Sequence, residues 1–154
     1  MSSLDDSEVL DSAAGDSAEQ RRAEEYLVEH LGNSLNVNLK KRKFKLPGRG
    51  WLEVDGVCDS PPVLCEAWVH VGPAKSAQKN TVLADTLKLL YVERINSAPA
   101  RKILLFGDSL AARRFKRQNW MGSALEHFGI EIQVIELPDA IREEVTKAQK
   151  RQLR

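Results

Sequence analysis

Two turn sequences lie close together in the first half of the chain, and they constrain the fold more than any other feature. Residues 47–50 read Pro-Gly-Arg-Gly, and residues 59–62 read Asp-Ser-Pro-Pro. They separate three stretches of strand-like composition, at residues 35–46, 51–58 and 63–71. Strands joined by such short turns pair antiparallel with their neighbours. The sequence therefore predicts a three-stranded antiparallel meander.

Helical patterns flank this meander. Apolar residues at spacings of three and four predict a first helix over residues 18–31, which we expect to stop at Gly32 and Asn33. The same pattern predicts a long second helix over residues 76–95, with Ser76 as its N-cap. The three strands are therefore expected to have one helix before them and one helix after them in the sequence.

The rest of the chain alternates between short strands and helices. We expect strands at residues 102–106 and 130–137, a helix at 111–128 with a break around residues 118–122, and a last helix at 139–152. A hairpin meander followed by crossover helices predicts an α/β fold, in which a mixed central sheet has helices on both faces. With 154 residues, the chain fits one domain, at 19–154.

Charge is unevenly distributed along the chain. Residues 1–18 are rich in Ser, Asp and Ala and are expected to form a disordered acidic tail. The first 20 residues hold six of the 22 acids and no Lys or Arg, so the remaining body carries a formal charge of +7. Such a body suits an anionic partner, although a charged surface also keeps a domain soluble.

Neither a membrane span nor the layout of a signal peptide is found in the sequence, so we expect a cytoplasmic protein without membrane contact. Cys58 and Cys65 are then expected to be reduced.

Two acids stand on the second and third expected strands. Asp55 follows Val54 and precedes a glycine, and Glu66 lies within the third strand. A carboxylate inside a sheet is costly unless it is paired or bound to a metal. Acids on adjacent strands can converge, and two carboxylates with waters and phosphate oxygens suit Mg²⁺. The pair is therefore a candidate metal site.

At these residues the chain resembles the PD-(D/E)XK restriction-endonuclease-like superfamily. The shared order is helix, three-stranded meander, helix and strand, over about residues 19–108. Asp55 is similar to the Asp that ends the second strand, and Glu66 to the acid of the following tripeptide. The resemblance implies a Mg²⁺- or Mn²⁺-dependent endonuclease acting on DNA, and nucleases of this fold often work as homodimers. A glutamate of the first helix often joins such sites, and Glu24, Glu25 or Glu29 fits that role.

The chain departs from this pattern at the lysine of the tripeptide, where Trp68 stands. The resemblance implies that the lysine acts on the attacking water, so another residue would have to replace it. Lys75, Gln78 and Lys79 are candidates at the start of the second helix, and His70 shares the strand face of Glu66. If none replaces the lysine, the domain is an inactive nuclease fold that binds nucleic acid or a protein.

A basic stretch precedes the candidate site. It is the best candidate for a contact with the phosphate backbone of DNA. The same lysines could instead protect an edge strand from aggregation. The residues concerned are Lys40, Lys41, Arg42, Lys43, Lys45 and Arg49.

Residues 106–110, Phe-Gly-Asp-Ser-Leu, match the signature of the GDSL hydrolases. A serine nucleophile needs a base, and the Asp-x-x-His pair of those enzymes has no counterpart around His127. We therefore interpret the segment as a strand-to-helix turn in which Asp108 or Ser109 caps the helix.

Overall fold

The computed structural model describes residues 17–116 and 118–152, and within them five strands form one mixed sheet. Strands β1 (Lys40–Lys45), β2 (Trp51–Asp59) and β3 (Pro62–Trp68) pair antiparallel. Strands β4 (Arg101–Phe106) and β5 (Ile130–Val134) continue the sheet parallel to β3. The strands follow one another across the sheet in chain order. The predicted meander and the mixed α/β sheet are thereby confirmed.

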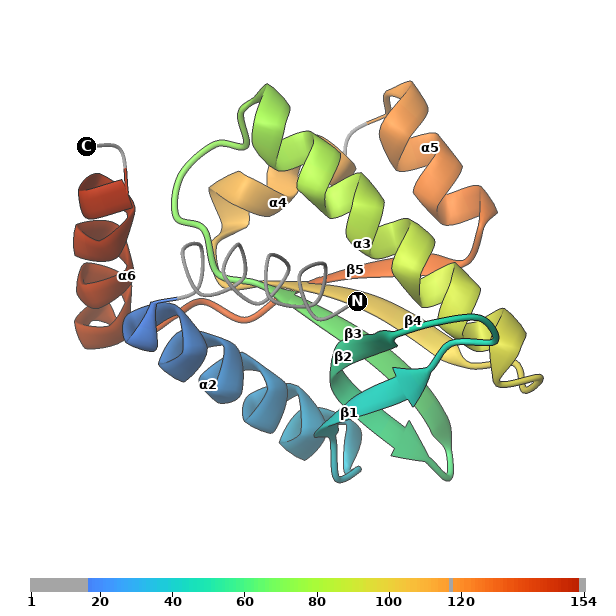
Figure 1. Ribbon diagram of the computed structural model, residues 1–154. Helices are drawn as coiled ribbons and strands as arrows, with labels where there is room; N and C mark the ends of the chain where they lie inside the picture. Colours follow the sequence, from blue (N-terminus) through green and yellow to red (C-terminus); the bar gives the residue numbers. More distant parts are fainter. Residues whose placement is uncertain (1–16, 117, 153–154) are drawn as a thin grey trace.

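Helices cover both faces of the sheet (Figure 1). Helices α2 (Ala18–Leu35) and α6 (Asp139–Gln152) lie on one face. Helices α3 (Ser76–Ile95), α4 (Ser109–Lys116) and α5 (Trp120–His127) lie on the other. None of the helices in the described part of the chain is long and apolar enough to cross a membrane.

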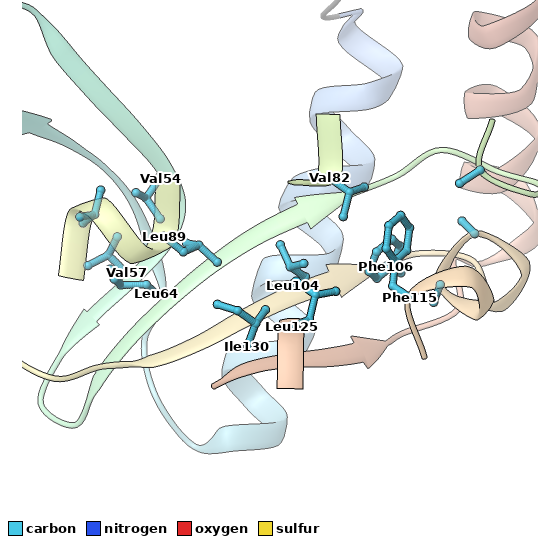
Figure 2. Close-up of a cluster of buried hydrophobic side chains, with 14 residues drawn as sticks. Val54, Val57, Leu64, Val82, Leu89, Leu104, Phe106, Phe115, Leu125 and Ile130 are labelled. Carbon is cyan, nitrogen blue, oxygen red and sulfur yellow. The ribbon is translucent and has the colours of Figure 1, made fainter. Parts of the chain in front are cut away.

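Each face has its own hydrophobic core. Figure 2 shows the core beneath α3, in which Leu89 meets Leu64 of β3 and Leu104 of β4, with Phe106 and Phe115 farther along. The core on the α2 side contains Leu27, Leu31 and the alternate residues of the same strands. Because β3 and β4 are buried on both faces, they read as nearly continuous apolar runs. Glu66 interrupts one of these runs and is therefore exceptional.

Two expected helix ends are wrong, each for a local reason. Helix α2 continues past Gly32, where an added Cβ would meet the Val37 oxygen at 2.8 Å, so this glycine serves close packing. The helix ends at Asn36 in the left-handed conformation. Lys75, not Ser76, is the N-cap of α3, and the Gln78 side chain accepts from its backbone N–H at 2.7 Å.

The break expected around residues 118–122 is confirmed. The segment forms two helices, α4 and α5, because the Asn119 side chain starts a new helix by accepting from the Gly122 N–H at 2.9 Å. The expected acidic tail falls almost wholly on residues 1–16, which lie outside the described residues.

Candidate active site

The candidate site lies where β2 separates from β3. The two strands pair from Asp59 opposite Pro62 to Gly56 opposite Cys65, and Asp55 is the next residue of β2. On the other side, Asp55 and Gly56 together face the single residue Lys41 of β1, which makes a β-bulge. Such a bulge re-aims side chains, and bulges are frequent beside active sites.

The Asp55 side chain spans the gap that this separation opens. Its Oδ2 accepts a hydrogen bond from the backbone N–H of Ala67 at 2.9 Å. The bond joins β2 to β3 beyond the end of their regular pairing. It also fixes the carboxylate beside the residue that follows Glu66. The hydrogen bond thus ties Asp55 to the strand that carries Glu66, while the convergence of the two carboxylates on one metal ion stays a prediction.

Glu66 lies in β3 on the face that α3 covers, and its side chain is only 3% exposed. Its Oε1 contacts Nζ of Lys88, which reaches down from α3 and is itself 22% exposed. A buried carboxylate without a partner would be strongly destabilising, so this ammonium group is what makes Glu66 tolerable in the sheet.

Several charges meet at this ion pair. Burial lowers the pKa of Lys88, while the nearby carboxylates of Asp55, Glu53 and Glu24 act to raise it. Asp85 precedes Lys88 by three residues and therefore lies on the same side of α3. Burial, and then the negative charge of Asp55, raise the pKa of Asp85 to about 7. The site thus concentrates negative charge that Lys88 alone does not balance.

A hollow of about 420 Å³ opens beside Asp55, between α2 and the β1–β2 hairpin. Its acidic lining comes from Asp55 and from three glutamates of α2, and Lys41 of β1 adds a basic group. These glutamates are Glu24, Glu25 and Glu29, the residues that the sequence analysis named as candidates for the site. All three therefore border the same hollow as Asp55.

The donor chemistry of the site suits a hard cation. Within residues 17–116 and 118–152, no group of three or more His, Cys, Asp or Glu residues could hold a metal ion by itself. Asp55 and Glu66 offer carboxylate oxygens, and the Asp55 Oδ1 makes no hydrogen bond to another described residue. Mg²⁺ commonly binds through one or two carboxylates and completes its shell with water and substrate phosphate. The two acids fit this mode of binding.

His70, one of the residues considered as replacements for the missing lysine, lies near a different carboxylate, that of Asp108. The Nδ1 of His70 lies 3.2 Å from Nε2 of Gln78. Burial lowers the pKa of His70, and the charges that act on it are those of Asp108 and Lys75. No ion pair joins Lys75 or Lys79 to Asp55 or Glu66 among the described residues. Their proposed roles stay predictions without a contact to support them.

Lys88 is the site residue that sequence reasoning missed. Asp85, three residues before it, offered a signal, because it lies three residues after Val82 and four before Leu89, within the apolar stripe of α3. The sequence alone predicts a surface salt bridge for Asp85, as is usual for an acid on a helix. That prediction is wrong, because Asp85 is half-buried and has no ion pair with another described residue.

The basic residues of β1 divide between its two faces. Arg42 lies over the Phe44 ring at 5.7 Å and forms two hydrogen bonds of 2.8 Å with Asp59. Lys43 and Lys45 lie on the opposite face and are exposed, and no ion pair joins either to another described residue. Lys40 and Arg49 are exposed as well. The lysines are therefore available to a partner, whereas Arg42 is engaged within the protein.

The turn that resembles the GDSL signature is structural. Asp108 is buried and directly precedes α4, and its backbone oxygen accepts a hydrogen bond from the Ala112 N–H at 3.2 Å. Its side chain does not cap the helix, contrary to expectation, because both carboxylate oxygens are used elsewhere. Oδ2 accepts from the Gly72 N–H at 2.7 Å, and Oδ1 accepts from Nη2 of Arg142 at 2.7 Å. The backbone N–H of Ser109 donates to Oε1 of Glu136 at 3.0 Å.

Comparisons of the chain with protein-family models, with curated proteins and with solved structures find no match.

Proposed function

We propose that the protein is a cytoplasmic, Mg²⁺- or Mn²⁺-dependent DNA endonuclease, a divergent member of the PD-(D/E)XK superfamily. One observation carries the proposal: where β2 leaves β3, Asp55 is hydrogen-bonded to the backbone of the residue after Glu66, and Lys88 supplies an ammonium group to Glu66. This set restores the two acids and one lysine of the superfamily pattern, with the lysine moved from the strand to α3.

The order of elements supports the same assignment. Helix α2, the β1–β2–β3 meander, α3 and β4 follow one another as in the superfamily core, and β4 adds parallel to β3. The candidate acids lie on the two strands that carry them in that pattern. Glu24, Glu25 and Glu29 border the hollow beside Asp55 from the first helix.

Each residue has a distinct task in this proposal. A divalent ion held by Asp55 and Glu66 would lower the pKa of a bound water and stabilise charge on a phosphodiester. Lys88 would orient the attacking water by donating a hydrogen bond to it once Glu66 turns to the ion. The exposed lysines of β1 would hold the phosphate backbone close to Asp55.

The alternative is an inactive nuclease fold that binds nucleic acid or a protein. The contact between Lys88 and Glu66 also favours this alternative, because a buried ion pair can be purely structural. The two functions differ in whether the acids are needed for cleavage or only for folding.

The test is cleavage of supercoiled plasmid with Mg²⁺ or Mn²⁺. We expect nicking by the full chain, and at least a 100-fold loss in Asp55→Asn, Glu66→Gln and Lys88→Met. Glu126→Gln is the control, because Glu126 is exposed on α5 and has no ion pair with another described residue. Folded protein that nicks neither plasmid nor single-stranded DNA would favour the inactive fold.

A further inference from the structure

The hairpin of β1 and β2 has two unlike faces. On one face, Phe44 and Leu52 are paired across the strands and pack against the core beneath α3. On the other face, Lys45 is paired with Trp51 and Lys43 with Glu53, and Asp55 follows along the same strand. The second face therefore runs from an exposed aromatic ring, past free lysines, to the candidate active site.

Trp51 is unusual among the aromatic residues because it is 63% exposed at the start of a strand. Its cross-strand neighbour Lys45 is exposed too, so the ring lies beside a positive charge and not within a core. An exposed indole beside lysines is the combination that single-strand binding proteins use, in which a base stacks on the ring and cations hold the phosphates.

The charges along this face are open to a ligand. Lys41 is partly engaged, since its Nζ lies 3.7 Å from Oε1 of Glu53. Neither Lys43 nor Lys45 has an acid within ion-pairing distance among the described residues. Alternate residues on a strand lie about 6.6 Å apart, so the three lysines form a regular row that ends opposite the bulge at Asp55.

We infer that this face binds single-stranded nucleic acid, with Trp51 stacked on an unpaired base and Lys43 and Lys45 holding the adjoining phosphates. In a duplex the faces of the bases are covered by their neighbours, so the ring could reach only an unpaired base. For the position of cleavage, the inference rests on the proposed function. It adds that the substrate would be DNA with a single-stranded segment leading to Asp55.

Binding can be measured separately from cleavage. The full chain, in EDTA, is titrated into a fluorescently labelled single-stranded oligonucleotide and into a duplex of the same length, and anisotropy is recorded. We expect tighter binding to the single strand. Trp51→Ala should weaken that binding about tenfold or more, whereas Trp51→Phe should retain most of it because a ring remains.

Trp120 provides the matched control. It is 71% exposed, but it begins α5 and is not part of the hairpin. Trp120→Ala should leave the affinity for the single strand unchanged. Because both tryptophans are exposed, neither substitution should alter the urea midpoint by much, and that measurement guards against a folding defect.

The outcomes separate the inference from the proposed function. Three results would each overturn the inference, even if plasmid is nicked. These are equal affinity for duplex and single strand, unchanged affinity in Trp51→Ala, and an equal loss of affinity in Trp120→Ala. Single-strand binding that depends on Trp51, in a protein without metal-dependent cleavage, would support the binding face and overturn the nuclease.

Discussion

Lys88 of α3 and Glu66 of β3 form an ion pair in which the Glu66 side chain is 3% exposed and the Lys88 side chain 22% exposed. The pair joins the middle of α3 to the central part of the sheet, next to Asp55. The local cost of burying Glu66 is thus offset by a residue of another element. Stability and the proposed chemistry consequently depend on the same contact.

Lys88→Met should destabilise the fold by about 3 kcal/mol or more, because it leaves Glu66 buried without a partner. The loss should be larger at pH 8 than at pH 5, since an unpaired buried carboxyl is tolerated better when it is protonated. Urea unfolding at the two pH values measures both effects.

The double variant Lys88→Met with Glu66→Gln serves as the control for this prediction. It should recover much of the lost stability, because both charges are removed together. Lys79→Met, on the same helix, should change stability by less than about 0.5 kcal/mol. Additive losses in the double variant would show that Lys88 and Glu66 do not depend on each other.

Asp85 should make the protein less stable as the pH rises from about 4 to 7. Its pKa in the folded protein is about 7, well above the ordinary 3.8, so the unfolded chain releases the proton first over this range. Above pH 7 both states are ionised, and the cost is then constant.

Asp85→Asn should therefore raise the free energy of unfolding by roughly 2 kcal/mol or more at pH 8, and by little at pH 4. Urea unfolding across this pH range measures the difference between the two proteins. Direct evidence would come from the carboxyl carbon of Asp85 in an NMR titration. A midpoint near 4, or an equal gain at both pH values, would contradict the prediction.

Local signals account for the parts of the fold that could be predicted from the sequence. The turns at residues 47–50 and 59–62 fix the antiparallel meander, and the apolar stripes place the helices. The end of α2 was predicted wrongly at Gly32, because a glycine after an apolar stripe usually ends a helix, whereas this one allows the close approach of Val37. The left-handed turn at Asn36, which brings Val37 back to Gly32, was not predicted from the sequence.

The residues of the candidate site also divide into those that a local signal predicts and those that it does not. Asp55 and Glu66 are recognisable because acids are rare in strands, and their hairpin brings them together. Lys88 lies 22 residues after Glu66, and one lysine on a long helix is unremarkable until the packing angle of α3 is known. The packing of α3 on β3, and not the helical pattern, selects Lys88 over Lys79.

The two faces of β1 should differ in their effect on DNA binding. Lys43→Ala and Lys45→Ala should each weaken binding and reduce the slope of log affinity against log salt by about 1, as expected for a phosphate contact. Arg42→Ala should leave the slope unchanged, because its guanidinium is bound to Asp59. Anisotropy titrations at several salt concentrations measure the slopes. Equal changes in all three variants would indicate a diffuse charge effect without a defined binding face.

Substitutions of Asp108 and Ser109 should differ strongly in their effect on stability, although the two residues are neighbours in the GDSL-like segment. Asp108→Ala should cost about 3 kcal/mol, because it removes the partner of the Gly72 N–H and leaves Arg142 without the acid that it contacts at 2.7 Å. Ser109→Ala should change stability by less than about 0.5 kcal/mol, since the hydrogen bond to Glu136 comes from its backbone.

Ester hydrolysis separates this structural role from a catalytic one. A serine hydrolase would cleave p-nitrophenyl acetate and lose that activity in Ser109→Ala, whereas we expect no difference between the variant and the unmodified chain. Activity that Ser109→Ala abolishes in a fully folded protein would make Ser109 a nucleophile. His70 would then be the first candidate for the base, because the charge of the Asp108 carboxylate acts on it.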